Sequence, residues 1–170
     1  MTESLFLNYS VHELRQLQSR IEECLGRLTD EQIWARHSDN ENAVGNLVLH
    51  LCGNVRQWIV SGVGGQPDVR ARDREFAARG SVMREELRER LAGTLDAAVP
   101  VIEGMDAASL ARTITVQGYE VTVLEAIYHV VEHFSMHTGQ IIFATKLLTR
   151  QDLGFYAHLS GGTQAGDPTP

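Results

Sequence analysis

The sequence predicts an all-α protein, a single four-helix bundle with a small β-hairpin before the last helix. Four long segments carry apolar residues at every third or fourth position, which is typical of helices that pack one face on a core. Between the third and fourth segments, residues 112–121 instead alternate β-branched residues around a Gln-Gly pair, which indicates a hairpin. The chain has 170 residues, 43% of them hydrophobic, enough for one compact core.

The first two helices are predicted at about Ser4–Arg27 and Asn42–Val60. Between them, Thr29 and Gln32 form a capping box that opens a short turn ending near Trp34. A glycine-rich segment, 61–67, ends the second helix. The apolar positions of the two helices are Leu7, Leu14, Leu17, Ile21, Leu25 and Leu28, and Val44, Leu47, Val48, Leu51, Val55, Trp58 and Ile59.

The third helix is predicted to begin at Ser81, which serves as its N-cap, and Pro100 should kink or end it near its last turn. The fourth begins with the capping box of Thr122 and Glu125 and continues to about Leu148. The apolar positions of the third helix are Met83, Leu87, Leu91, Leu95, Ala98 and Ile102, and those of the fourth are Val123, Ile127, Val130, Val131, Phe134, Ile141, Ile142 and Leu148.

Two segments lack such a period. Residues 68–80 carry four arginines and are predicted to form an exposed loop, and residues 161–170 are Gly, Pro and polar and are expected to be a disordered C-terminal tail. No internal repeat or linker divides the rest, so residues 1–160 are predicted to form one domain.

Charge and composition exclude several classes of partner. A net charge of −7 disfavours nucleic acid and anionic membrane surfaces. No stretch reaches the roughly 18 apolar residues of a membrane span. The N-terminus has neither a basic region nor a continuous apolar segment, so we expect no secretory signal and a cytoplasmic location. Cys24 and Cys52 lie in apolar helical patterns and are predicted to be reduced core thiols.

Three of the seven histidines, His129, His133 and His137, follow one another at intervals of four in the last helix. Residues four apart share a helix face with Cβ atoms about 6 Å apart, so two such imidazoles can reach one metal ion. At about 100° per residue, His133 and His137 lie beside the apolar stripe, and His50 lies similarly on the second helix, next to Asn54. Metal binding competes here with ordinary packing and capping roles, with a hydrogen-bonded core histidine at position 50, and with bis-histidine haem ligation.

Other catalytic motifs are missing. The sequence contains no Glu-x-x-His, no His-Glu-x-x-His, no phosphate-binding glycine-rich loop and no Gly-x-Ser-x-Gly elbow. A di-iron centre and the thermolysin type of hydrolase therefore have no support.

Two motifs, Asn46-Leu-Val-Leu-His50-Leu and His129-Val-Val-Glu-His133-Phe-Ser-Met-His137-Thr-Gly-Gln140-Ile, make the sequence resemble the DinB/YfiT-like superfamily of metalloenzymes, and within it the DUF1572-type branch. The stretches 31–34 and 72–76 also look like this branch, and the resemblance spans about 5–156. It implies an up-down-down-up bundle in which His50, His133 and His137 hold one metal ion. Many relatives have Arg where this chain has Thr138, which puts the identity of the substrate in doubt.

Three imidazole ligands are neutral, so a divalent ion bound by them keeps a net charge of +2. At least one coordination position of the ion stays open, which is typical of a catalytic site. Such an ion can lower the pKa of bound water to about 7 or stabilise a thiolate. The resemblance includes S-transferases that use bacillithiol, mycothiol or glutathione, so a metal-dependent S-transferase with a low-molecular-weight thiol as co-substrate is the leading hypothesis. The alternatives are a metal-dependent hydrolase and a non-catalytic stress or ligand-binding protein braced by the metal.

Asn54, His129 and Gln140 are the candidates for side chains that position the metal ligands. Zinc is the default ion and nickel the second choice, because three imidazoles suit several metals. The arginines of the 68–80 segment could hold the carboxylates of a thiol, although a solvated charged loop is the preferred interpretation; they are Arg70, Arg72, Arg74 and Arg79. We expect a small-molecule substrate, a homodimer, and neither nucleic acid nor membrane as a partner.

Overall fold

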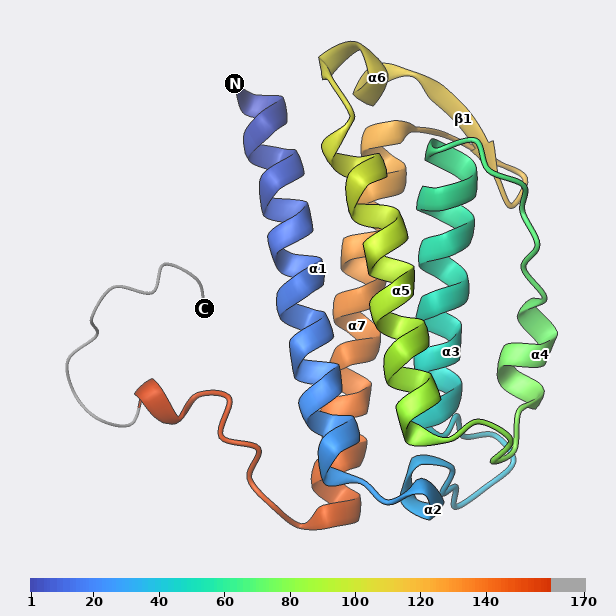
Figure 1. Cartoon of the computed structure of the whole chain (residues 1–170), viewed down its shortest axis with the longest axis vertical. Coiled ribbons are helices and arrows are strands. Elements are labelled where there is room, and N and C mark those ends of the chain that lie inside the picture. Colours follow the sequence, from blue (N-terminus) through green and yellow to red (C-terminus); the bar gives the residue numbers. More distant parts are fainter. Residues whose placement is uncertain (160–170) are drawn as a thin grey trace.

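Four long helices packed side by side form the body of the protein in a computed structural model, which describes residues 1–159 (Figure 1). They are α1 (Thr2–Arg27), α3 (Val44–Val55), α5 (Arg84–Glu103) and α7 (Val123–Thr149). Helices α1 and α7 run in one direction and α3 and α5 in the other, and α1 and α3 each pack on both α5 and α7. The predicted all-α bundle with up-down-down-up order is therefore confirmed. The predicted tail, 161–170, lies outside the described residues.

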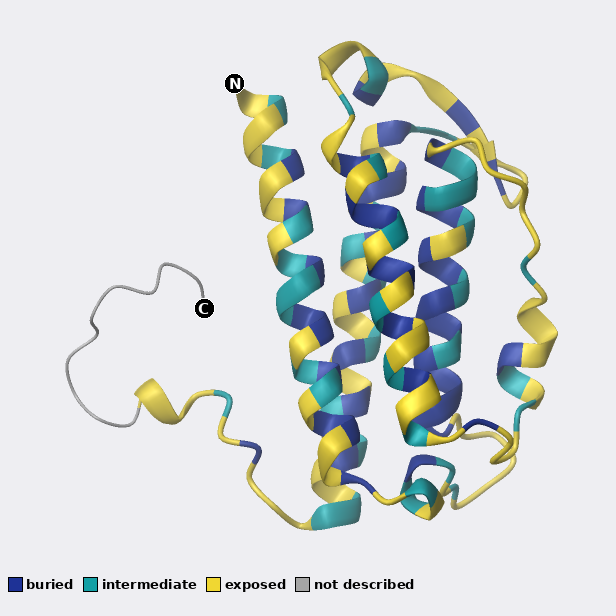
Figure 2. Ribbon diagram, in the orientation of Figure 1, coloured by how far each residue is buried: buried dark blue, intermediate teal, exposed yellow. Residues whose placement is uncertain are grey.

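The core is one continuous cluster of apolar side chains along the inner faces of the four helices (Figure 2). The largest fully buried members come from all four, with Leu14, Leu51, Leu91 and Phe134 as examples. Burying each such side chain contributes roughly 1.5–3 kcal/mol, which explains why the apolar period in the sequence located the helices. Met83 is an exception, since 59% of it is exposed.

The helix ends follow the local capping patterns with one exception. The capping box of Thr29 and Gln32 opens α2 (Asp30–Ile33), as predicted. The prediction that Ser81 caps the third helix is wrong, because α5 begins at Arg84. The backbone N–H of Arg84 donates to Oδ1 of Asp30 at 2.8 Å, so a carboxylate from α2 caps α5 through a tertiary contact. Pro100 lies in the last turn of α5, as expected.

The second long helix changes type before it ends. Its α-helical part stops at Val55, and the chain continues as a π-helical segment, η1 (Arg56–Val63). The prediction of one uniform helix to Val60 was wrong in this respect, because two turns are too short for the apolar period to distinguish the two helix types. Most π-helices are single turns within α-helices and are frequent at functional sites, so an eight-residue π-helical segment is unusual.

Because α3 and α5 are parallel, the chain must cross the length of the bundle between them, and we call residues 64–83 the crossover (Figure 1). It contains a short helix, α4 (Arg72–Ala77), that the sequence did not predict. The prediction of an exposed loop is wrong at two positions, since Glu75 is 9% exposed and the side chain of Arg70 is 4% exposed. The two side chains can be buried because they form an ion pair with each other.

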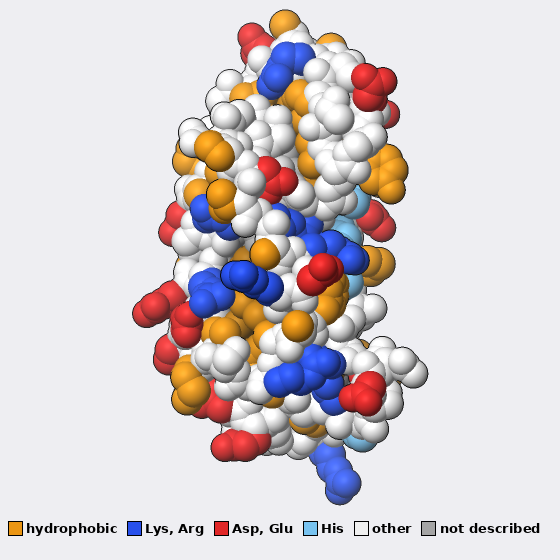
Figure 3. Space-filling model, turned by 90° about the vertical axis from the view of Figure 1, so that its right-hand side faces the viewer, with side chains coloured by type: hydrophobic (Ala, Val, Ile, Leu, Met, Phe, Trp, Pro, Cys, Tyr) orange, Lys and Arg blue, Asp and Glu red, His pale blue; other side chains and the backbone are white. Residues whose placement is uncertain are grey.

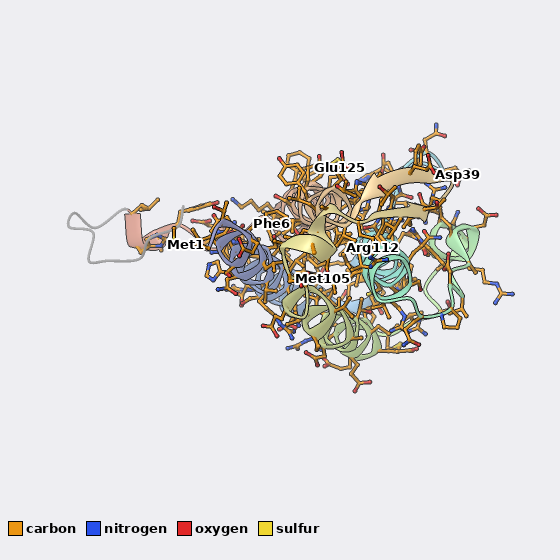
Figure 4. The ribbon with its side chains drawn as sticks, turned by 90° about the horizontal axis from the view of Figure 1, so that it is seen from above. Met1, Phe6, Asp39, Met105, Arg112 and Glu125 are labelled. Atoms are coloured by element: carbon orange, nitrogen blue, oxygen red, sulfur yellow. The ribbon has the colours of Figure 1, made fainter. Side chains whose placement is uncertain are left out.

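The predicted hairpin is present. After α6 (Ala107–Ala111), strands β1 (Thr113–Val116) and β2 (Tyr119–Thr122) pair antiparallel, and the turn residues Gln117 and Gly118 have φ angles of 54° and 81°. Seen from above, the hairpin lies across the end of the bundle near the first turn of α7, where Glu125 is labelled (Figure 4). Thr122 and Glu125 form the predicted capping box at the start of α7.

Two further predictions concern the cysteines and the membrane-spanning potential of the helices. Cys24 and Cys52 are buried and form no disulfide, as predicted for core thiols. None of the helices within residues 1–159 combines the length and the apolar character needed to cross a membrane.

Candidate metal centre

Three histidine side chains from two helices converge between α3 and α7. Nε2 of His133 lies 3.1 Å from Nε2 of His50 and 3.2 Å from Nε2 of His137. One ring nitrogen of each histidine lies within 4.8 Å of those of the other two, so the group could hold a metal ion. The structure thus brings together the three residues that the resemblance implied.

The hydrogen bonds around the cluster fit a cation. Nδ1 of His50 lies 3.0 Å from Oε2 of Glu75 and 3.1 Å from Nη2 of Arg70, and Nδ1 of His137 lies 2.6 Å from Oε1 of Gln140. The carboxylate of Glu75 and the amide oxygen of Gln140 can only accept, so each Nδ1 is assigned the proton. A neutral imidazole carries a single N–H, so the Nε2 atoms of both rings turn lone pairs toward His133. Nitrogens bound to a tetrahedral zinc ion at about 2.0–2.1 Å lie about 3.3 Å apart, close to the spacing observed. The donor set therefore suits one divalent ion.

Glu75 orients His50 and was missed by the sequence reasoning. Its carboxylate also accepts from Arg70, with Nε to Oε1 at 2.7 Å and Nη2 to Oε2 at 2.8 Å. Burial raises the pKa of Glu75, but the hydrogen bonds from Arg70 and His50 outweigh it and leave the pKa below its usual value. Glu75 is thus an anion that keeps the proton of His50 on Nδ1 and leaves Nε2 free for a metal.

The residues around His50 bind the crossover. Nδ2 of Asn46, one turn earlier in α3, donates to the carbonyl oxygens of Glu75 at 2.8 Å and Ala78 at 3.1 Å. Gly53 leaves the space that the carboxylate occupies, because a Cβ atom there would collide with Oε1 of Glu75. The sequence signal for this contact was weak: Asn46, His50 and Gly53 place two polar side chains and a gap on one face of α3, which indicates only that a polar segment packs there.

Burial keeps the histidines of α7 neutral. It lowers the pKa of His133, and the charges of His137 and His50 lower it further, to about 3. Burial also lowers the pKa of His137, against the opposing effect of its hydrogen bond to Gln140. Both rings are uncharged at pH 7, the form in which imidazole binds metals.

The three predicted positioning residues occupy different places. Gln140 contacts His137, as described above. His129 makes no such contact: its ring packs on Trp58, with centroids 4.2 Å apart, and lies 5.5 Å from the ring of His133. Asn54 lies one turn beyond His50 and is 4% exposed, and its Oδ1 has no hydrogen-bond partner within residues 1–159.

A cavity of about 550 Å³ opens beside the cluster, and we call it the histidine cavity. His50 and His133 form part of its wall, and the hairpin contributes Gln117 and Tyr119. Its lining also includes Arg70, whose charge is neutralised by Glu75, and Arg72. Viewed from the crossover side, basic side chains gather on this face and histidines reach the surface beside them (Figure 3).

Comparison with known proteins places the chain in a family. Residues 2–160 match the model of DUF1572, described as a protein of unknown function. No curated protein matches the sequence. Because the family model covers nearly the whole described chain, membership does not rest on a single motif.

Solved structures share the fold at low identity. A conserved protein from Enterococcus faecalis has a TM-score of 0.69 and 16% identity over 85% of this chain and 97% of its own. A DinB-like protein from Bacillus cereus has a TM-score of 0.65 and 16% identity, covering 84% and 89%. A mutant of mycothiol-dependent maleylpyruvate isomerase has a TM-score of 0.58 and 14% identity, covering 79% of this chain and 60% of its own. The chain therefore belongs to the DUF1572 family and has the fold of DinB-like proteins.

Proposed function

We propose that this protein is a metal-dependent S-transferase that joins a low-molecular-weight thiol to an electrophilic small molecule. One observation carries the proposal: the Nε2 atoms of three histidines converge, and two of these histidines, His50 and His133, line a cavity of about 550 Å³. A site that only braced the fold would be closed by a fourth protein ligand. The thiol is favoured over water because the mycothiol-dependent isomerase shares the fold.

A divalent ion at this site supplies a Lewis-acid charge that lowers the pKa of a thiol at its open position. His50, His133 and His137 would hold the ion, and Glu75 orients His50. In the reaction the thiol loses its proton to solvent, its sulfur forms a bond to the electrophilic carbon, and the leaving group departs with its electron pair.

Neither cysteine of the chain suits the role of nucleophile. Both are buried, and burial raises the pKa of the Cys52 thiol to about 11 and also raises the pKa of Cys24. A thiolate is the reactive form, so these side chains are inert at neutral pH. The external thiol of the proposal supplies what the chain itself lacks.

We propose zinc as the ion and nickel as the second choice, since imidazole ligands suit both. A hydrolase that uses water at the same position is the alternative chemistry, and a metal-braced binding protein is the non-catalytic alternative. The cytoplasmic location, the small-molecule substrate and the homodimer stay predictions.

Elemental analysis of the purified protein is the first test, with one divalent ion per chain expected. The second is conjugation of bacillithiol, mycothiol or glutathione to monochlorobimane by zinc- and nickel-loaded protein. His137→Ala should abolish the acceleration, whereas His12→Ala, which changes an exposed histidine of α1, should not. His50→Ala should weaken metal binding with helix content retained.

The alternatives give different results. Metal-loaded protein that hydrolyses ester or amide substrates but conjugates no thiol would favour the hydrolase. If chelation lowers the melting temperature sharply and no thiol or ester reacts, the metal only braces the bundle.

A further inference from the structure

Three residues that line the histidine cavity have a buried polar atom without a hydrogen-bond partner within the part of the chain that the structure describes. One is Nδ1 of His133, which belongs to the metal cluster; the other two are Oδ1 of Asn54 and Nε1 of Trp58. Asn54 and Trp58 are 4% and 6% exposed, so bulk solvent does not satisfy these two atoms. Buried polar atoms are almost always paired in folded proteins, because an unpaired one costs free energy. Two unpaired atoms on residues that line one cavity, Asn54 and Trp58, point to a ligand that supplies both partners.

The two groups are placed in line with the metal centre. Asn54 and Trp58 follow His50 at intervals of four along α3 and η1, and residues at this spacing project from one helix face about 6 Å apart. Packing against the ring of His129 holds the Trp58 indole, with centroids 4.2 Å apart. All four residues line the same cavity. A molecule bound at the histidine cluster and extending along the cavity would therefore pass Asn54 and Trp58.

The chemistry of the two atoms defines the group that they can bind. An indole N–H only donates, and an amide oxygen only accepts. The ligand must present an acceptor to Trp58 and a donor to Asn54. Of the charged residues that line the cavity, Arg70 is neutralised by Glu75, and Arg72 is opposed by Glu120 and Glu125, so the lining has no excess of positive charge and an uncharged group fits it. An amide combines a carbonyl oxygen and an N–H without charge.

We propose that Asn54 and Trp58 form a subsite that recognises an amide group of the thiol substrate. The amide carbonyl accepts from Nε1 of Trp58, and the amide N–H donates to Oδ1 of Asn54. The inference rests on the proposed function, because it assigns the substrate class of the same site: thiols that carry an amide a few bonds from the sulfur.

A matched pair of small thiols tests the subsite on the zinc-loaded full chain by isothermal titration calorimetry. 3-Mercapto-N-methylpropanamide and methyl 3-mercaptopropanoate differ only in an N–H that replaces an ester oxygen. We expect the amide to bind about tenfold more tightly, because the ester leaves Oδ1 of Asn54 unpaired. Equal affinities in the wild-type protein would overturn the proposal and would mean that water satisfies the two atoms.

Two variants separate the two hydrogen bonds. Asn54→Leu should remove the preference for the amide, because it removes the acceptor for the N–H. Trp58→Phe should weaken both thiols alike and keep the preference, because both have a carbonyl oxygen. Asn8→Leu, which changes an exposed asparagine of α1, is the control and should alter neither affinity. A preference that survives in Asn54→Leu would contradict the assigned role of Asn54.

The thiol-free pair N-methylpropanamide and methyl propanoate distinguishes failure of the subsite from failure of the proposed function. If neither thiol binds with the help of zinc but the thiol-free amide still binds better than the ester, the thiol function is wrong and the subsite stands. If both thiols bind equally and neither thiol-free compound is preferred, the metal-dependent binding of thiols stands and the subsite is wrong.

Discussion

Glu75→Gln should separate the metal centre from the fold that carries it. Glutamine has the shape of glutamate but only one acceptor oxygen, whereas the carboxylate of Glu75 accepts three hydrogen bonds from Arg70 and His50. The amide nitrogen of the new side chain would face at least one N–H donor. His50 would no longer be held with its proton on Nδ1, and Arg70 would lose its counter-charge.

The magnitude follows from the burial of these groups. The side chains of Arg70 and Glu75 are 4% and 10% exposed, and breaking such a buried pair costs about 3–5 kcal/mol. One hydrogen bond survives in the amide, so the lower value, about 3 kcal/mol, is expected. For a chain of this size that corresponds to a melting temperature lowered by about 6–12 °C. Loss of a carboxylate that orients a histidine ligand weakens metal binding by about 10–100-fold.

The assays are zinc competition against a chromogenic chelator and thermal unfolding of the metal-free protein by circular dichroism. Glu89→Gln is the matched control, since Glu89 is an exposed carboxylate on α5 and should change neither quantity. Zinc affinity in Glu75→Gln within about threefold of the wild type would refute the reasoning, because the orienting hydrogen bond would then contribute nothing to binding.

Three further predictions follow from single features. Gly53→Ala should push the carboxylate of Glu75 away from His50, because the added Cβ collides with that carboxylate. The variant should lose about 1–3 kcal/mol of stability and bind zinc more weakly. Unchanged zinc affinity would argue against the contact between Glu75 and His50. The pKa of His133 is about 3 in the folded protein and about 6.5 in the unfolded chain. As the pH falls from about 6.5 toward 3, the unfolded chain binds the proton first, so the metal-free protein loses stability. In urea unfolding across this range, the free energy of unfolding should decline less for His133→Asn than for the wild type. The homodimer stays a prediction, and Phe143 of α7, which is 65% exposed, is the residue chosen to test it. If this face of α7 forms the dimer, Phe143→Glu should yield a monomer in sedimentation equilibrium, and a monomeric wild type would exclude the dimer.

Helices, helix starts and turns that are determined by residues close together in the sequence were predictable from it. The apolar periods located four helices because each helix buries one face, and the capping boxes at Thr29 and Thr122 marked two helix starts. The turn at 117–118 was predictable from Gly118, which tolerates the positive φ that a tight hairpin turn requires, although Gln117 also has a positive φ. The spacing of His133 and His137 placed both on one helix face for the same local reason.

The predictions from the sequence were wrong or incomplete at places where segments distant in the chain contact each other. The start of α5 depends on Asp30, 54 residues earlier in the chain, and no local pattern near Ser81 contains that information. The crossover has no apolar period of its own, so its sequence predicts a solvated loop. Its two buried residues are charged, and only their mutual pairing makes burial favourable.

The metal centre shows the same division. The histidine spacing and the family resemblance identified His50, His133 and His137 as candidate metal ligands. A helical period, however, shows only which side chains share a face of one helix. The approach of His50 to His133 across 83 residues, the carboxylate of Glu75 on Nδ1 and the cavity beside them follow from how α3, α7 and the crossover pack. Such contacts depend on the positions of whole elements in space, and a local sequence period carries no information about those positions.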